Sequence, residues 1–123
     1  MDRITLTGMR YEGRLGATDD ERALPQLVEI DLEIDADLST AGDSDALDDT
    51  VDYGPLVELT QRIVESGSYK LMEGLAGAIV EQTLRRSLRI EAVTVRVRKL
   101  AVPLDVDMDH AQVELSRRRT RAS

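Results

Sequence analysis

The order of hydrophobic patterns along the chain predicts an α+β fold built on an antiparallel sheet. Two segments with strand-like alternation come first, two segments with helical spacing follow, and two more strand-like segments come last. Strands and helices grouped in this way usually place the helices on one face of an antiparallel sheet. The chain has 123 residues, a length typical of one domain. We therefore expect a single domain with a four-stranded antiparallel sheet and the order ββααββ.

The strand expected over residues 27–38 has the clearest pattern. Four aliphatic residues alternate there with four acids, namely Val28, Ile30, Leu32 and Ile34 with Glu29, Asp31, Glu33 and Asp35. Because side chains alternate between the two faces of a strand, this spacing separates the aliphatic residues from the acids. Alternating valines predict another strand over 90–100, and a weaker alternation predicts a last short strand over 110–115.

The other segments follow from helical spacing and from turn residues. Alternation near the N-terminus predicts a first strand, which we expect to bend at Gly8 because glycine inside a strand often marks a bulge. Pro55 is well placed in the first turn of one helix. Apolar residues at helical spacing predict a second helix over about 70–87. The polar segment 18–21 is expected to be a loop or an irregular turn, and the segment 39–49 is expected to be a loop.

Composition excludes several classes of function. The formal net charge is −8, which argues against a general nucleic-acid-binding protein, because such proteins need a basic face. The chain has no cysteine, so neither disulfides nor cysteine metal sites are expected. No apolar stretch is long enough to cross a membrane, and no apolar signal segment begins the sequence. We therefore expect a cytoplasmic protein that binds neither nucleic acid nor membrane.

Few residues stand out as candidates for chemistry when each is considered alone. The acids of the 39–49 segment lack the spacing of a calcium loop, and the only histidine, His110, cannot build a metal site without other strong ligands. No metal site is expected. Glu73 lies early in a helix, where a negative charge is stabilised by the helix dipole. Lys99 lies at a strand end and can extend its ammonium group to solvent. Residues 119–123 are expected to form a basic tail after a domain of residues 1–118.

Together, five short segments resemble the dihydroneopterin aldolase family. They occur in order along the chain, as Gly8 to Ala17, Asp20-Glu21 with Gln26, Asp49-Thr50-Val51-Asp52-Tyr53, Leu71-Met72-Glu73 and Val95-Arg96-Val97-Arg98-Lys99. The resemblance covers residues 3–118. It implies the tunnelling fold, in which an antiparallel sheet carries two helices on one face and the sheets of several subunits join into a barrel. It also implies a tetramer or an octamer with active sites between subunits.

The family resemblance implies a metal-free retro-aldol reaction in folate biosynthesis, with no cofactor. The substrate would be 7,8-dihydroneopterin, and the products 6-hydroxymethyl-7,8-dihydropterin and glycolaldehyde. The dihydropterin ring accepts the electrons of the broken bond, so the protein needs only to move protons. By resemblance, Lys99, Glu21 and Tyr53 are the catalytic residues, with Tyr53 supplied by a neighbouring subunit. The substrate would be bound by Glu73, Met72, Ala17, Thr50 and Val51.

Two positions depart from the common family pattern and leave alternatives open. Leu15 stands where many members have histidine, and Leu100 stands where many have proline. Lysine followed by leucine is similar to the related dihydroneopterin triphosphate 2′-epimerase, so epimerase activity is a second expectation. Arg14, Arg22 and the C-terminal arginines could offer charge to a triphosphate. A non-catalytic pterin-binding protein of the same fold is the alternative from another class.

Overall fold

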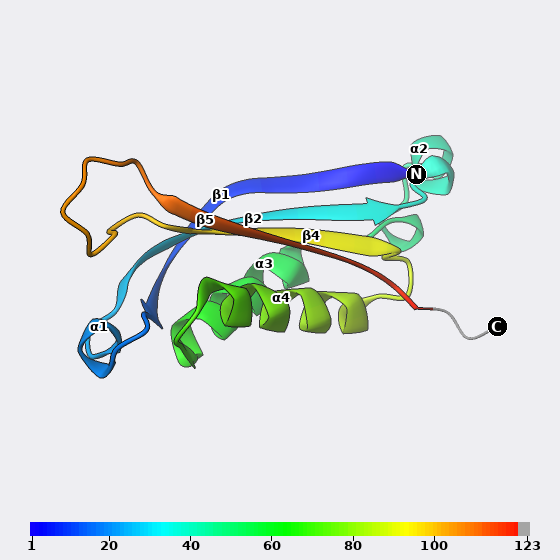
Figure 1. The fold of residues 1–123 in the computed structure, drawn as a ribbon. Helices are drawn as coiled ribbons and strands as arrows, with labels where there is room; N and C mark the ends of the chain where they lie inside the picture. The colour runs from blue at the N-terminus through cyan, green and yellow to red at the C-terminus, as the bar shows by residue number, and fades with distance from the viewer. Residues whose placement is uncertain (121–123) are drawn as a thin grey trace.

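The computed structural model describes residues 1–120 and has one curled sheet covered on one face by two helices (Figure 1). Four long strands form most of the sheet: β1 (Asp2–Leu15), β2 (Gln26–Ala36), β4 (Ala92–Lys99) and β5 (Ala111–Arg118). They pair in the order β1-β2-β4-β5, and every one of these pairings is antiparallel. The predicted α+β class and the four expected strands are therefore present.

The sheet has a fifth strand that the prediction of a four-stranded antiparallel sheet did not include. Strand β3 (Ser68–Tyr69) pairs in parallel with Arg14 and Leu15 at the end of β1, so the sheet is mixed. A two-residue strand shows no alternation in the sequence, which is why the pattern did not reveal it. Its pairing brings the connection between the two long helices against the end of β1, next to the site described below.

Strand β1 bends where the sequence predicted a bulge. Its register against β2 shifts between Leu6 and Met9. Gly8 has a φ of +72°, a conformation that residues with a Cβ adopt rarely. Its backbone N–H donates to Asp31 Oδ1 at 2.8 Å. The bend therefore has a hydrogen-bonded partner on the neighbouring strand.

Two long helices, α3 (Gly54–Ser66) and α4 (Met72–Arg86), cover the apolar face of the sheet. Helix α3 packs on β1, and α4 packs on β4 and β5. The alternating aliphatic residues of β2 and β4 face these helices and are fully buried. Aliphatic residues make up the buried core, and they include Ile30, Leu32, Ile34, Leu56, Leu75, Ile79, Val93 and Val95.

The two segments predicted to be loops or irregular turns contain short helices, so that prediction was wrong for both. Helix α1 (Asp19–Arg22) begins after Thr18, whose hydroxyl accepts a hydrogen bond from the Glu21 N–H at 3.2 Å. Helix α2 (Ser39–Ser44) and a 3₁₀ turn, η1 (Leu47–Asp49), occupy the segment 39–49. Asp, Ser and Thr are frequent both in loops and at helix starts, so composition alone does not separate the two.

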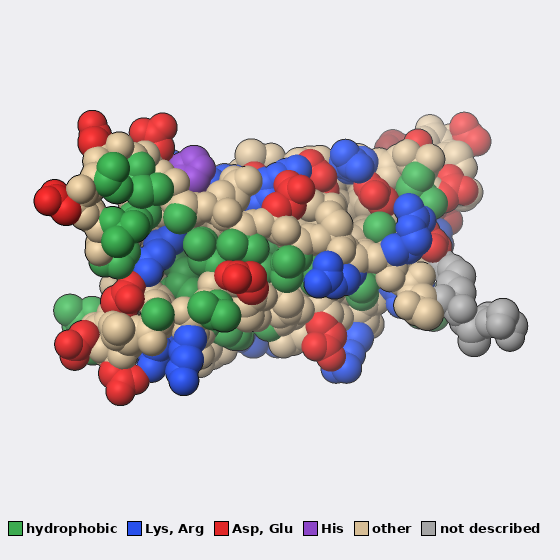
Figure 2. Space-filling view, viewed as in Figure 1, with side chains coloured by type: hydrophobic (Ala, Val, Ile, Leu, Met, Phe, Trp, Pro, Cys, Tyr) green, Lys and Arg blue, Asp and Glu red, His purple; other side chains and the backbone are tan. Residues whose placement is uncertain are grey.

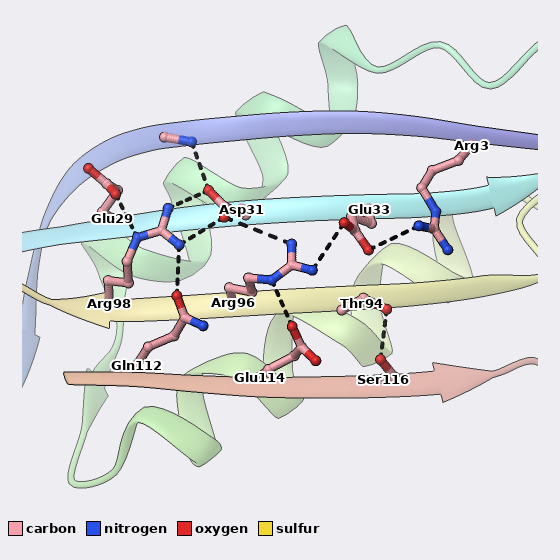
Figure 3. Close-up of polar contacts among 11 residues, drawn as sticks. Arg3, Glu29, Asp31, Glu33, Thr94, Arg96, Arg98, Gln112, Glu114 and Ser116 are labelled. Carbon is pink, nitrogen blue, oxygen red and sulfur yellow. Dashed lines mark hydrogen bonds and ion pairs between the residues drawn. The ribbon is translucent and has the colours of Figure 1, made fainter. Parts of the chain in front are cut away.

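The sheet face opposite the helices carries an array of ion pairs (Figure 3). Arg98 on β4 donates to Asp31 and Glu29 on β2 and to Gln112 on β5. Arg96 contacts Glu33 on one side and Glu114 on the other. The predicted separation of acids from aliphatic residues in β2 is confirmed, and the acids pair with arginines of the neighbouring strands.

Arg119, placed in the expected tail, is attached to the body of the domain. Its guanidinium donates to the backbone carbonyls of Leu84, Ser87 and Ile90, and its N–H donates to the Glu91 carbonyl. A cation at the end of α4 complements the helix dipole and its unpaired carbonyls. Residues 121–123 lie outside the described part of the chain. Within residues 1–120, no helix is both long and apolar enough to span a membrane.

Candidate active site

A pocket of about 270 Å³ lies at one end of the sheet, where α1, the start of α4 and the loop after β4 meet. It is lined by residues from these elements and the end of β1, namely Leu15, Gly16, Ala17, Glu21, Lys70, Leu71, Met72, Glu73, Lys99, Val102, Pro103 and Leu104. Figure 2 shows hydrophobic side chains gathered at this end of the molecule. Five of the eight expected site residues line this pocket.

The alternation of β4 determines where Lys99 points. Val93, Val95 and Val97 face the helices, and Lys99 continues this odd-numbered series because side chains on a strand alternate. It is the last residue of β4, so its stem follows the apolar face to the edge of the core. Its ammonium group therefore emerges in the pocket instead of on the charged face where Arg98 lies.

Glu21 reaches Lys99 from the short helix α1. The Lys99 Nζ donates to Glu21 Oε2 at 2.6 Å, and the two side chains are only 13% and 23% exposed. This hydrogen bond to the ammonium group holds the pKa of Glu21 below its ordinary value. The pair fixes the position of the Lys99 ammonium against the Glu21 carboxylate.

Glu73 lies in the first turn of α4 and is exposed to the pocket. Within residues 1–120 its carboxylate has no ion pair or side-chain hydrogen bond, so both oxygens can accept hydrogen bonds from a ligand. Met72 and Ala17 line the same pocket. A carboxylate can accept two parallel hydrogen bonds from adjacent N–H groups of a planar ring. The pocket thus combines the Glu73 carboxylate, which can accept hydrogen bonds from such a ring, with the Lys99 ammonium group, whose position is fixed by Glu21.

Tyr53, Thr50 and Val51 lie at the opposite end of the helical layer. Val51 is buried in a depression where the start of α3 meets Arg86 and Ser87 at the end of α4. Helix α4 has 15 residues, and at about 1.5 Å per residue it separates its two ends by roughly 20 Å. Tyr53 is 55% exposed. Within one chain these three residues do not reach the pocket that holds Lys99.

Several lining residues were not singled out from the sequence. Lys70 precedes α4, and within residues 1–120 its ammonium group has no ion pair. Val102, Pro103 and Leu104 belong to the loop between β4 and β5 and form another wall. The only signal in the sequence was their position directly after Lys99. Leu15, noted as a departure from the family pattern, is buried at the base of the pocket.

The family model for FolB, described as dihydroneopterin aldolase, matches residues 4–116. The chain belongs to the dihydroneopterin aldolase family. It is an aldehyde-lyase, an enzyme that breaks a carbon–carbon bond. The dihydroneopterin aldolase of Streptococcus pyogenes serotype M3 is 40% identical over 119 residues, which cover 97% of this chain and 100% of that protein.

Two solved aldolase structures have the same fold. The structure of the Burkholderia thailandensis dihydroneopterin aldolase, bound to guanine, has a TM-score of 0.78 and 26% identity, covering 97% of this chain and 92% of that one. The structure of the Escherichia coli enzyme in complex with neopterin has a TM-score of 0.87 and 23% identity, covering 95% of this chain and 99% of that one. The second likeness concerns the fold alone.

Proposed function

We propose that this pocket performs the dihydroneopterin aldolase reaction on 7,8-dihydroneopterin. The C1′–C2′ bond breaks, the 2′ hydroxyl loses its proton and becomes the aldehyde of glycolaldehyde, and the bond electrons enter the C6=N5 imine as an enamine. Protonation of that enamine gives 6-hydroxymethyl-7,8-dihydropterin. The observation that carries the proposal is the Lys99–Glu21 pair at 2.6 Å in the same pocket as Glu73.

Glu73 is the proposed anchor of the pterin ring. Its carboxylate has no protein partner within residues 1–120, and a pterin presents an amino group and a ring N–H side by side. Two parallel charge-assisted hydrogen bonds would fix the ring in one orientation. Met72 and Ala17 supply nearby lining. Neopterin in the Escherichia coli structure and guanine in the Burkholderia structure are fused-ring ligands of this kind.

Lys99 is the proposed centre of proton transfer. Its ammonium group carries three N–H donors, and Glu21 occupies one of them. The remaining donors can stabilise the 2′ oxygen as it loses its proton and becomes the aldehyde oxygen, and they can relay protons through water. Glu21 keeps the ammonium in place and offsets its charge in a partly enclosed site. This arrangement performs general acid–base chemistry with the chain's own residues.

Three expected site residues lie at the other end of α4 within one chain, namely Tyr53, Thr50 and Val51. They are therefore proposed to reach the pocket of a second copy. In the described chain, β5 pairs only with β4, and most of β1 pairs only with β2, so both sheet edges are open. Open edges favour pairing with another strand, and a closed ring removes them. We propose a homo-oligomer built on a ring of four copies, either as a tetramer or as an octamer of two rings. The proposed location of the enzyme is the cytoplasm.

The triphosphate epimerase alternative has less support from the arginines that suggested it. The Arg14 guanidinium donates to the carbonyls of Arg22 and Ala23, and Arg22 donates to the Gly16 carbonyl and pairs with Asp19. Arg119 lies at the end of α4, away from the pocket. These groups already have partners, so a triphosphate would have to displace existing hydrogen bonds.

Product analysis tests the reaction directly. The purified protein is incubated with 7,8-dihydroneopterin and, separately, with its triphosphate, and the products are resolved by chromatography. We expect 6-hydroxymethyl-7,8-dihydropterin and glycolaldehyde from the first substrate. Epimerisation of the triphosphate without cleavage of dihydroneopterin would favour the sister enzyme. A protein that binds a pterin and converts neither substrate would be a non-catalytic member of the fold.

A mixing experiment tests whether the site is shared between copies. Lys99→Met and Tyr53→Phe chains are prepared separately, dissociated in mild denaturant, and reassembled together. If Tyr53 acts in a neighbour's pocket, some mixed pockets contain both native residues and form the normal product at a restored rate. If each pocket used its own Tyr53, every pocket in the mixture would lack one residue and no activity would return.

A further inference from the structure

Helix α1 carries Glu21 to the pocket, and its local hydrogen bonds are the Thr18 cap and two backbone contacts, from the Arg22 N–H to Thr18 and from the Ala23 N–H to Asp20. It has four residues and none of them is buried. One helical turn is unstable in isolation, because nucleation fixes several residues for a single hydrogen bond. The position of the Glu21 carboxylate therefore depends on groups that attach α1 to the rest of the domain.

Arg22 folds back from α1 onto the strand that precedes it. Its Nη1 donates to the Gly16 carbonyl at 2.6 Å, and its side chain is only 14% exposed. The other terminal nitrogen pairs with Asp19, whose side chain is 99% exposed. The contact with Gly16 joins the end of α1 to the residue directly after β1.

Arg14 on β1 makes a second connection between β1 and α1. Its Nη1 donates to the carbonyl of Arg22 at 3.0 Å and to the carbonyl of Ala23. The last carbonyls of a helix have no partner inside the helix, so the Arg14 guanidinium satisfies them and ties the end of α1 to β1. The two arginines thus connect the same single turn to the end of β1, one extending from α1 and the other from β1.

The surroundings of Gly16 show how closely the Glu21 side chain packs against the residue after β1. A Cβ placed on Gly16 would lie 2.3 Å from the Glu21 Cβ and 2.8 Å from its Oε2. Real Cβ atoms do not approach other atoms so closely, so the side chain of Glu21 passes directly over the Gly16 backbone. A small outward shift of α1 would lengthen the 2.6 Å contact between Glu21 and Lys99.

We infer that Arg22 and Arg14 are positioning residues for the lyase reaction, which hold α1 so that the Glu21 carboxylate stays on the Lys99 ammonium. The inference rests on the proposed roles of Glu21 and Lys99. Neither arginine needs to touch the substrate. Their guanidinium groups act on backbone carbonyls, and the effect reaches the reacting atoms through Glu21.

The test compares Arg22→Met and Arg14→Met with Asp19→Asn in the full chain. Methionine keeps much of the apolar stem and removes the donors. Asp19→Asn removes the exposed ion pair of Arg22 and leaves its contact with Gly16. For each arginine variant we expect kcat to fall about ten- to a hundredfold, since a displacement of about 1 Å can cost roughly a hundredfold. KM, the melting temperature and the oligomer size should stay within error, and Asp19→Asn should match the parent.

The pH profile separates a positioning role from a merely structural one. The charged groups around Glu21 are Lys99 on β4, Lys70 and Glu73 beside the start of α4, Arg14 on β1, and Asp19, Asp20 and Arg22 on α1. Lys99 is the group that forms an ion pair with Glu21 within residues 1–120. Releasing α1 should let the pKa of Glu21 rise, so the acid limb of kcat should move to higher pH in both arginine variants.

Three outcomes would overturn the inference. The first is a kcat within twofold of the parent in both arginine variants. The second is a reduced kcat whose acid limb stays at the pH of the parent. The third is a loss of kcat in Asp19→Asn equal to that in the arginine variants. Gly16→Ala gives an independent check, because its Cβ must push Glu21 away, and it should reproduce the shifted acid limb. A Lys99→Met chain measured alongside keeps the two proposals distinct: full activity there would refute the proposed function itself.

Discussion

Arg98 and Lys99 are consecutive residues of β4, yet the strand places them in opposite environments. Arg98 lies on the charged face, where its guanidinium contacts Glu29, Asp31 and Gln112. Lys99 lies at the edge of the helix-covered face and, within residues 1–120, has one carboxylate partner, Glu21. Arg98 is thus a cation with nearly all of its donors used, whereas Lys99 keeps donors available.

The same contrast separates two carboxylates. Asp31 is buried, accepts hydrogen bonds from Arg98 and from the Gly8 N–H, and has a pKa below its ordinary value because of Arg98. Glu73 has no such partner within residues 1–120 and faces the pocket. A charged group whose hydrogen-bonding capacity is already used stabilises the fold, and one with spare capacity can bind a ligand. This division predicts that removing a group with spare capacity impairs binding or turnover, whereas removing a group without it impairs stability.

Lys99→Met should abolish turnover with little effect on stability. Removing the ammonium removes the donors that serve the reaction, and general acid–base groups contribute roughly a hundred- to ten-thousandfold in rate. The pair with Glu21 is partly solvated, so its loss should change the free energy of unfolding only slightly. Single-turnover kinetics and urea denaturation measure the two effects. A stable variant that retains normal turnover would remove Lys99 from the mechanism.

Arg98→Met should have the opposite signature. It leaves Asp31 and Glu29 without their main partner, and breaking a buried pair in this way costs about 3 kcal/mol. Turnover per folded molecule should stay close to that of the parent, because the guanidinium does not face the pocket. Arg10→Met is the matched control, since Arg10 pairs with the same Glu29 but is 63% exposed. Equal destabilisation by Arg98→Met and Arg10→Met would contradict the assignment of Arg98 as the cation that stabilises the fold.

The sequence predicts this division only in part. Alternation in β2 and β4 was enough to place the acids and the valines on opposite faces, because a period of two is visible without any tertiary information. It also places Lys99 on the side of the valines. The partners of Arg98 come from β2 and β5, far apart in the chain, and no local pattern specifies such register.

The pocket was predictable where a residue belongs to a recognisable segment. Glu21, Glu73 and Lys99 came from the family resemblance, and the structure places all three in one pocket. Lys70 and the loop after β4 were missed because tertiary packing alone brings them to that pocket. Strand β3 and helix α2 were missed because two residues show no period, and because capping residues resemble loop residues.

Glu73→Ala tests the carboxylate with spare capacity. Removing a charge-assisted, two-point contact should weaken pterin binding by tenfold or more, which is about 1.4 kcal/mol. Stability should hardly change, since Glu73 has no partner within residues 1–120 to leave unpaired. Glu81→Ala is the control on the same helix, because within residues 1–120 the one ion pair of Glu81 is with exposed Arg85. Calorimetry with a pterin measures the affinity, and unchanged binding would place the anchor elsewhere.

Carboxyl titration gives the finest test, because each cation should lower the pKa of its own partner. Lys99 holds the pKa of Glu21 low, and Arg98 holds that of Asp31 low. A depressed folded-state pKa contributes stability above the unfolded pKa, and this contribution is lost as the pH falls through the folded value. In ¹³C NMR titrations, Lys99→Met should raise only the Glu21 midpoint, and Arg98→Met should raise the Asp31 midpoint and leave Glu21 unchanged. A shift of both midpoints in either variant would show that the two clusters are coupled through β4, and that the division between them is incomplete.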